Sequence, residues 1–434
     1  MTNQKVKFLF IHYHYPPIKN SGIYRNYYLS SAIAQKLPQS WVLTSDNRKV
    51  LPNESMDVSE NLYRLEIPTF DYRTVFALLS REKKFAGAQF KESSKKNAFL
   101  QWLIKIQRSF PFNIFLAEGS ILYIICGYRK GKNLITQNNI TVIYSSFMPY
   151  ADHIIAYLLK HRFPEKIWVA DFRDLHIEPI YKNTIWIPIQ RWFEKKILSK
   201  ADLITTVSEG ISKKLEIYDR PIFTIAKGVS VRPIKKQFQK FTISYSGSLF
   251  LHYRDPKVLI VALHKLIKSK DIESKDINFI YAGKDSNQMR KWVEESGISD
   301  IFIDKGYLSR QASIEIQDKS HINLLLTSSS PDHQGLLTGK MFEYFEAQNQ
   351  ILCIIKGVYD SEIEGIFSSL QAGKIVYDPP IETDKLESFI LDKYHEWQNT
   401  GEVKSTINHK KLVEEYGWDV QADKLLDAIE SAKI

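Results

Sequence analysis

The sequence predicts an α/β protein made of two doubly wound, Rossmann-like domains that face a central cleft. The chain has 434 residues, which is more than one hydrophobic core usually holds. Short apolar runs of strand length alternate with longer segments of helical apolar spacing. This alternation occurs twice, on either side of residues 231–240, which contain a proline and four basic residues without periodicity. We therefore expect an N-terminal Rossmann-like domain over 1–230, a linker over 231–240, a second such domain over 241–415, and a helix over 416–434 that packs back on the N-terminal domain.

Each expected strand is a run rich in Val, Ile, Leu, Phe or Tyr that ends at turn residues. In the N-terminal half the expected strands cover 6–11, 41–44, 62–67, 140–144, 167–170, 201–207 and 222–226, with helices over 24–37 and 151–161 and a third capped by Ser208. In the C-terminal half the strands cover 241–245, 277–281, 301–304, 321–326 and 351–355, with helices over 256–268, from 286, from 309, from 338, and near the C-terminus. Strands that alternate with helices favour parallel sheets with right-handed crossovers.

Composition sets further limits. Hydrophobic residues make up 44% of the chain and aromatic residues 13%, which is ample for packed cores. Cys126 and Cys353 both lie in apolar runs, so we expect buried thiols in a reducing compartment and neither a disulfide nor a metal site. The apolar runs 8–11 and 121–126 are too short for a secretory signal or a membrane span. We expect a cytoplasmic protein that could lie on the inner face of a membrane.

Positive charge is concentrated in the N-terminal half. Residues 1–220 contain 32 Lys and Arg against 19 Asp and Glu, and residues 81–132 contain 11 basic against 3 acidic residues. In this second segment the basic residues are interleaved with aromatic ones. Such a pattern suits an anionic membrane surface. It would also suit nucleic acid, or it could be a solvated helical face. We favour the membrane surface and expect no nucleic-acid partner.

The most informative stretch is 335–347, which follows a buried strand and a polar turn. Thr338 is the expected N-cap of a helix, since its hydroxyl can accept from the free amides of the first turn. Gly339 leaves these amides open. Lys340 and Glu343 then share one helix face. This arrangement suits a phosphate at the helix start and sugar hydroxyls one turn further on. The alternative is an ordinary amphipathic helix with a solvated Lys–Glu pair.

The order of several segments resembles the GT-B glycosyltransferases, and among them the retaining family four. The segments that carry the resemblance are the loop from Tyr15-Pro16-Pro17 to Gly22 with Arg25, and the stretches 168–174, 201–208, 245–248 and 338–344. The resemblance covers nearly the whole chain. It implies a nucleotide-sugar donor, with UDP as the expected nucleotide, held mainly by the C-terminal domain, and no further cofactor.

On the donor side, the resemblance implies that Glu343 binds the ribose hydroxyls and that Lys340 and Arg254 neutralise the diphosphate. Fixed cations there stabilise the negative charge that builds on the leaving diphosphate. The amides near Gly247 and Gly339 would help, Thr338 belongs to the same donor-binding segment, and Tyr307 is a candidate base or ribose contact. The alternatives are an exposed Arg254 beside Asp255, a plain tight turn at Gly247, and simple packing of Tyr307.

On the acceptor side, the resemblance implies a glycine loop with Gly22 and Arg25. His153 is the candidate that contacts the transferred sugar, and Asp174 could orient an acceptor hydroxyl. The alternatives are a structural histidine and a carboxylate that caps a turn. In such a site the leaving diphosphate itself takes the acceptor's proton on the same face, which retains the anomeric configuration.

Three positions depart from the family pattern. Gly335 stands where the family has the first of two glutamates eight positions apart, so the resemblance does not identify the donor sugar. Lys227-Gly228 replaces the usual asparagine-glycine, so Lys227 is either a third phosphate cation or a linker residue. Neither Ser145 nor Ser146 matches the histidine often found after the fourth strand.

The sequence offers little support for other kinds of active site. The sequence has no Asp-x-Asp, no His/Cys pair at ligand spacing, no P-loop and no G-x-G-x-x-G, which argues against a metal, kinase or dinucleotide site. The leading hypothesis is a retaining, metal-independent transferase that acts on a surface-polysaccharide or lipid-linked glycan acceptor. A non-catalytic nucleotide-sugar-binding or partner protein of the same fold is the alternative, and a nucleic-acid binder is a third.

Overall fold

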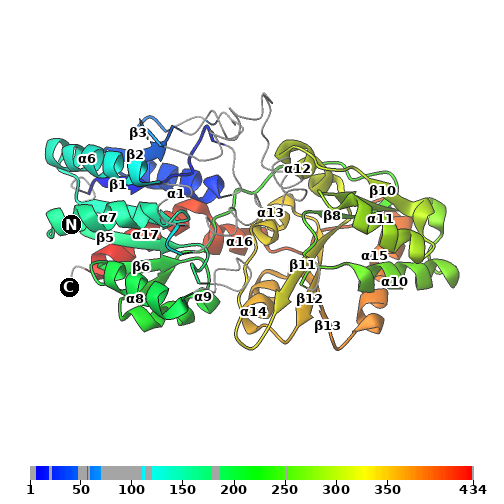
Figure 1. Ribbon diagram of the computed structural model, residues 1–434. Helices are drawn as coiled ribbons and strands as arrows, with labels where there is room; N and C mark the ends of the chain where they lie inside the picture. The colour runs from blue at the N-terminus through cyan, green and yellow to red at the C-terminus, as the bar shows by residue number, and fades with distance from the viewer. Residues whose placement is uncertain are drawn as a thin grey trace, which may run out of the picture. The chain divides into compact units, whose positions relative to one another are not determined.

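The computed structural model describes residues 6–18, 22–46, 56, 59–69, 110–112, 120–177, 186–250 and 253–432. The chain divides into two compact units (Figure 1). The N-terminal unit comprises Met1–Val207, Ile211–Gly228 and Gln421–Ile434, and the C-terminal unit comprises Ser208–Gly210 and Val229–Val420. Most of the basic segment 81–132 lies outside the described residues.

The N-terminal unit is built on a parallel sheet with strand order β3-β2-β1-β4-β5-β6-β7. Its central strands are buried along their length because helices cover both faces. Helices α6, α7 and α8 lie side by side over one face (Figure 1). The strands are β1 (Phe8–Ile11), β2 (Ser40–Ser45), β3 (Leu62–Ile67), β4 (Val142–Phe147), β5 (Ile167–Phe172), β6 (Leu203–Thr206) and β7 (Ile222–Thr224); the helices are α1 (Ile23–Lys36), α6 (Ile121–Asn138), α7 (Ala151–Arg162), α8 (Ile187–Leu198) and α9 (Glu209–Leu215).

The C-terminal unit contains a second parallel sheet, in the order β10-β9-β8-β11-β12-β13. The strands are β8 (Phe241–Ser246), β9 (Ile277–Ala282), β10 (Phe302–Asp304), β11 (Ile322–Ser329), β12 (Gln350–Gly357) and β13 (Gly373–Asp378). The helices are α10 (Lys257–Lys268), α11 (Ser286–Glu295), α12 (Arg310–Lys319), α13 (Gly339–Ala347), α14 (Ser361–Leu370), α15 (Thr383–Thr400) and α16 (His409–Tyr416), and α17 (Trp418–Ser431) ends the chain.

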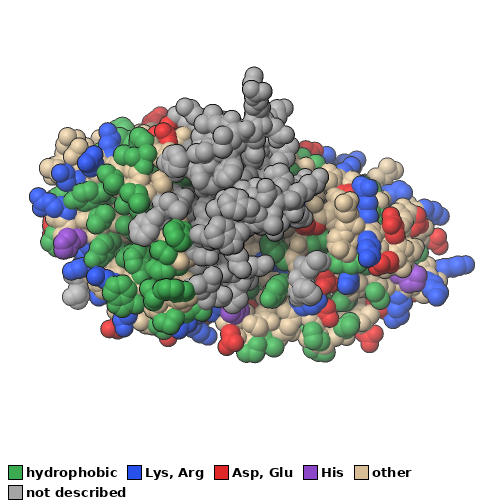
Figure 2. Space-filling model, viewed as in Figure 1, with side chains coloured by type: hydrophobic (Ala, Val, Ile, Leu, Met, Phe, Trp, Pro, Cys, Tyr) green, Lys and Arg blue, Asp and Glu red, His purple; other side chains and the backbone are tan. Residues whose placement is uncertain are grey.

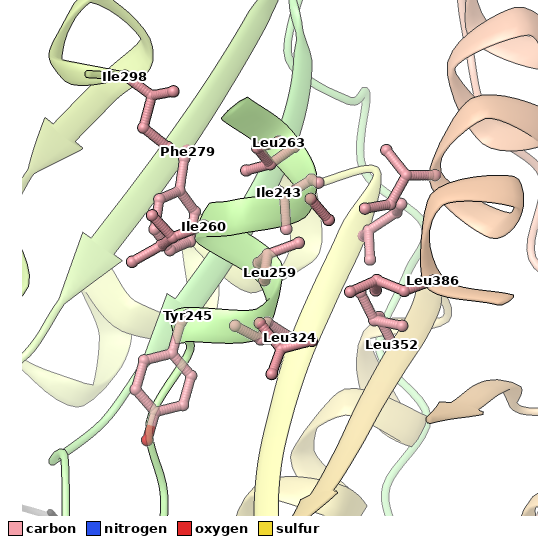
Figure 3. Close-up of a cluster of buried hydrophobic side chains, with 14 of the residues drawn as sticks. Ile243, Tyr245, Leu259, Ile260, Leu263, Phe279, Ile298, Leu324, Leu352 and Leu386 are labelled. Carbon is pink, nitrogen blue, oxygen red and sulfur yellow. The ribbon is translucent and has the colours of Figure 1, made fainter. Parts of the chain in front are cut away.

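The core of the C-terminal unit explains why these strands are so apolar. Side chains from β8, β11 and β12 pack against α10 and α15, as Figure 3 shows for Ile243, Leu324, Leu352, Leu259 and Leu386. All five are fully buried. Burying each such side chain stabilises the fold by roughly 1.5–3 kcal/mol.

The two sheets confirm the predicted fold class of two doubly wound α/β domains. Strand limits differ in two places that matter for the site. Strand β5 continues to Phe172, so Asp171 belongs to the strand and not to the loop after it. Strand β11 runs to Ser329, three residues beyond the predicted end. Both cysteines are free thiols, and no helix in the described part of the chain is long and apolar enough to cross a bilayer.

Each sheet reverses its order of connection at one point. In the N-terminal unit β1 lies between β2 and β4, and in the C-terminal unit β8 lies between β9 and β11. The loops after the two central strands diverge there, and the crevice at the carboxyl ends of such strands is where doubly wound sheets bind ligands. The loop that follows β8 carries Gly247, and the loop that follows β11 leads through 335–338 into helix α13.

Candidate active site

Gly247 and Lys340 meet at the point where the C-terminal sheet reverses. A Cβ atom placed on Gly247 would lie 2.7 Å from Lys340 Cε and 3.1 Å from Tyr245 Oη. The lysine stem therefore passes directly over the glycine, and a side chain at position 247 would displace it. A role of Gly247 in donor binding stays a prediction. The contact places the Lys340 side chain beside the carboxyl end of β8.

Arg254 lies in the same neighbourhood. Burial raises the pKa of the Tyr245 hydroxyl, and the positive charge of Arg254 opposes that rise, so the guanidinium is close to the same tyrosine that Gly247 and Lys340 approach. The guanidinium also lies 5.1 Å from the centre of the Phe250 ring. Its neighbour Asp255 is bound by Lys356, with 2.7 Å between Nζ and Oδ2. Two cations thus converge on one tyrosine at the carboxyl edge of the sheet.

Helix α13 begins at Gly339 with Thr338 as its N-cap, as the sequence pattern predicts. The expected capping bond is absent: the Thr338 hydroxyl accepts from no helix amide. Its Oγ1 is buried and has no hydrogen-bond partner among the described residues. A buried polar atom without a partner costs free energy, roughly 1–3 kcal/mol, so a ligand atom at this position would be favourable.

Glu343 lies one turn after Lys340 on the same helix. Its Oε1 is 3.6 Å from Nη2 of Arg310, which comes from the start of α12. Glu343 is thus paired with a residue of a neighbouring helix. No local sequence pattern signals Arg310, because the pairing joins two separate helices.

The surroundings of position 335 leave no room for the glutamate that the family pattern has there. Gly335 has a φ of +67°, and a Cβ atom there would lie 2.0 Å from Glu362 Oε2. The Glu362 carboxylate in turn accepts from the amides of Glu209 and Gly210 at 2.8 and 2.9 Å, within the same unit. Burial raises the pKa of Glu362, although these two amides oppose the rise. A glutamate does not fit at position 335 because another carboxylate occupies the space.

Tyr307 follows the edge strand β10 and has 82% of its surface exposed. The packing alternative for this residue is therefore wrong. Its contact with a nucleotide base or ribose stays a prediction.

In the N-terminal unit, Arg25 is not available to an acceptor. It is 5% exposed, and its Nη2 donates to Asp171 Oδ1 at 2.9 Å while its Nη1 donates to the Ala226 carbonyl at 2.7 Å. Ser146 and Thr205 also donate to the Asp171 carboxylate. The expected role of Arg25 in the acceptor loop is thus wrong, because the side chain is buried and paired with Asp171.

Arg25 and Asp171 each favour the charged form of the other, which burial disfavours. Burial alone would lower the pKa of Arg25, but Asp171 raises it. Burial alone would raise the pKa of Asp171, but Arg25 and the Thr205 hydroxyl lower it. Both groups are therefore charged at neutral pH. Asp171 is a residue that the sequence reasoning missed, since it was assigned to a loop.

Gly22 is held in place by Arg173. The Gly22 carbonyl accepts from Arg173 Nη1 at 2.6 Å, and Nε of the same guanidinium donates to the Phe147 carbonyl at 3.0 Å. This arginine ties the loop after β1 to the end of β4. Asp174 follows in the next position and is exposed. The structure thus places Gly22 and Asp174 at the carboxyl edge of the N-terminal sheet.

His153 lies in the first turn of α7, as predicted, but its ring is fully buried. Ser145 Oγ lies 2.7 Å from Nδ1 and accepts from the Trp168 indole at 2.9 Å. Burial lowers the pKa of His153 to about 3, so the ring is neutral at pH 7. The Phe172 ring packs 4.8 Å away. The structural alternative holds, because a side chain with no exposed surface does not touch a sugar.

Known structures resemble this chain over nearly its full length. A glycosyltransferase from Rickettsia africae ESF-5 superposes with a TM-score of 0.58 at 12% identity and covers 99% of both chains. The chain has the GT-B fold. The lipopolysaccharide outer core galactosyltransferase WaaB gives a TM-score of 0.54 at 12% identity, covering 99% of this chain and 100% of that one.

A third GT-B structure is the UDP-forming α,α-trehalose-phosphate synthase from Burkholderia xenovorans, with a TM-score of 0.55 at 10% identity over 98% of this chain and 100% of that chain. No protein-family model and no curated protein matches the sequence. At such low identity the likeness establishes the GT-B fold alone.

Proposed function

We propose that this GT-B protein is a retaining glycosyltransferase that moves a sugar from a nucleotide-sugar donor to a surface-polysaccharide or lipid-linked glycan acceptor. The observation that carries the proposal is the convergence of Lys340 and Arg254 on Tyr245 beside Gly247. This convergence lies at the reversal point of the C-terminal sheet. The GT-B structures that resemble the chain include a UDP-forming synthase and a lipopolysaccharide galactosyltransferase, which supports UDP and a glycan acceptor.

The two cations suit the chemistry of the donor. As the bond between sugar and diphosphate breaks, negative charge grows on the leaving phosphate oxygens, and fixed positive groups stabilise it most where water is excluded. Lys340 and Arg254 supply the charge that a divalent cation would otherwise supply, so we propose a metal-independent reaction. The Thr338 hydroxyl, which is buried without a partner among the described residues, would bond a phosphate oxygen.

Glu343 completes the donor site in this proposal. Its carboxylate, oriented by Arg310, would accept from the two ribose hydroxyls. Tyr307 would reach the base from the exposed loop after β10. Proton transfer from the acceptor hydroxyl to the leaving phosphate on the same face of the sugar would retain the anomeric configuration, with Asp174 orienting that hydroxyl.

Replacement of Lys340 tests the site. Lys340→Ala should abolish transfer from labelled UDP-sugars, and its thermal unfolding temperature, measured alongside, checks that the fold is kept. Lys291→Ala is the matched control, because this α11 lysine is 67% exposed and pairs with Glu295 of its own helix. Full transfer by the Lys340→Ala variant would refute the site.

The non-catalytic alternative is favoured by one observation, the burial of His153. A binding or partner protein of this fold would take up UDP-sugars without turnover. Release of labelled UDP by the wild-type protein, absent in Lys340→Ala, would exclude this alternative. UDP-sugar binding without any release would establish it.

A further inference from the structure

The outer surface of the α6–α7–α8 layer exposes several large apolar side chains among the described residues. Figure 2 shows hydrophobic side chains gathered over these helices of the N-terminal unit. Large exposed apolar patches mark contacts with a membrane or another molecule. The residues that form this patch come from α6 and α8, the two outer helices of the layer.

Helix α8 presents two tryptophans to solvent. Trp186, at its N-cap, is 65% exposed and Trp192 is 62% exposed, with Ile189 between them. Ile189 and Trp192 are three residues apart and therefore lie on one face. The opposite face is anchored in the unit by Glu194 and Ile197, both buried. Tryptophan is the residue that favours the boundary between lipid headgroups and acyl chains.

Helix α6 repeats the pattern. Ile121 is 51% exposed and Leu122 and Ile125 are each 44% exposed, while Tyr123 and Ile124 face the core. Exposed isoleucine and leucine in the first two turns of a helix cost free energy in water, about 25 cal/mol for each Å² of apolar surface. Both outer helices of the layer thus present large apolar side chains to solvent.

Basic residues lie further along the helices, on the C-terminal side of the apolar ones. The last turn of α7 contains His161 and Arg162, that of α8 contains Lys195 and Lys196, and the second half of α6 contains Arg129, Lys130 and Lys132. Basic residues at helix C-termini also complement the helix dipole, but that effect does not explain the exposed tryptophans.

The directions of the helices align these two zones. Each helix connects parallel strands and so runs opposite to them. Their N-terminal ends, with the apolar residues, therefore lie toward the carboxyl edge of the sheet, and the basic ends lie toward the other edge. Figure 2 shows Lys and Arg side chains at the outer margin of the hydrophobic area.

We propose that this face binds the surface of an anionic phospholipid bilayer. The apolar zone, Ile121, Leu122, Ile125, Trp186, Ile189 and Trp192, inserts at the headgroup boundary, and the basic zone contacts the lipid phosphates. Charge complementarity selects this occupant: the apolar zone is bordered by lysines and arginines, and the Lys196 ammonium lies 5.3 Å from the Trp192 ring. The lipid contact would bring the carboxyl edge of the N-terminal sheet, with Gly22 and Asp174, near the membrane. The membrane-binding proposal rests on the proposed function in one respect: a lipid-linked acceptor would then lie close to this edge of the sheet.

Co-sedimentation of the full chain with vesicles tests the proposal. The wild-type protein should bind vesicles of phosphatidylglycerol and phosphatidylcholine, and much less those of phosphatidylcholine alone. Lys195→Glu/Lys196→Glu should lower the partition coefficient at least 25-fold, since each basic residue near an anionic surface contributes roughly fivefold. Trp186→Glu/Trp192→Glu should lower it by a similar factor. Val261→Glu, on α10 of the C-terminal unit, is the matched control because Val261 is 56% exposed and lies outside the patch.

Three results would overturn the proposal. The first is absence of wild-type binding to anionic vesicles at 0.1 M salt, where screening acts over about 10 Å. The second is equal binding by all variants. The third is a change of oligomeric state in the tryptophan variants without any vesicle binding, which would make the patch a contact between copies of the chain. UDP binding by the same variants should equal that of the wild type, so a failure here is separable from a failure of the donor site.

Discussion

Adding one methyl group at Gly247 should weaken UDP binding through Lys340. A Cβ atom at this position would lie 2.7 Å from Lys340 Cε, whereas carbon atoms in contact are about 3.5–4.0 Å apart. The lysine stem must therefore retreat by roughly 1 Å. Since Cε is near the end of a flexible side chain, the retreat costs little in the free protein. The backbone φ of +158° adds a further cost of roughly 1 kcal/mol for alanine.

The loss of affinity follows from hydrogen-bond geometry. An ammonium bonds a phosphate oxygen at about 2.7–2.9 Å, and a retreat of about 1 Å breaks that contact. A hydrogen bond to a charged group contributes roughly 1.5–3 kcal/mol, so its loss corresponds to an increase of roughly 10- to 150-fold in the Kd for UDP. The Lys340→Ala variant sets the upper limit, since it lacks the ammonium altogether.

Titration calorimetry with UDP measures the effect, and a double-mutant cycle assigns it. In a Lys340→Ala background, Gly247→Ala should cause no further loss of UDP affinity, because the added methyl group acts by displacing the lysine. A backbone effect alone would give equal losses in both backgrounds. Equal losses, or unchanged binding by Gly247→Ala, would refute the reasoning.

Three further predictions concern other residues of the two units. Glu343→Ala should raise the Kd for UDP about tenfold but leave that for inorganic pyrophosphate unchanged, as measured by calorimetry; an equal loss for both ligands would contradict the ribose role. Arg25→Ala leaves the buried Asp171 charge unpaired and should lower the free energy of unfolding by about 3–5 kcal/mol in urea titrations, with a smaller loss when Asp171 is also made apolar. Burial raises the pKa of Glu194 to about 7 from an ordinary value near 4.5, so the folded chain keeps a proton that the unfolded chain releases, and stability should fall as the pH rises from 4.5 to 7. The Glu194→Gln variant should lack this fall of about 3 kcal/mol in the free energy of unfolding. If the variant and the wild type show the same pH dependence, the assignment to Glu194 is wrong.

The pattern of neighbouring residues determined the architecture and the start of the key helix. Alternation of apolar runs predicted both parallel sheets, and Thr338 followed by Gly339 predicted where α13 begins. These features depend on backbone preference and on which face of a strand or helix is apolar. Both are local properties that can be recognised in any stretch of about ten residues.

Only the tertiary structure decided which side chains meet. Asp171 was assigned to a loop, but strand β5 buries it against Arg25, a residue far away in the chain. His153 lies in the predicted helical turn, yet Ser145 and Phe172 enclose its ring. Whether a polar side chain faces solvent or a partner depends on what the fold brings against it.

The same holds within the proposed donor site. The motif 338–344 is continuous in sequence, but its environment is assembled from Gly247 and Arg310 on other elements. Position 335 is glycine because Glu362, from the next helix, fills the space where a side chain would go. Burial and charge pairing act between residues that are distant in sequence and adjacent in space, and no local period encodes them.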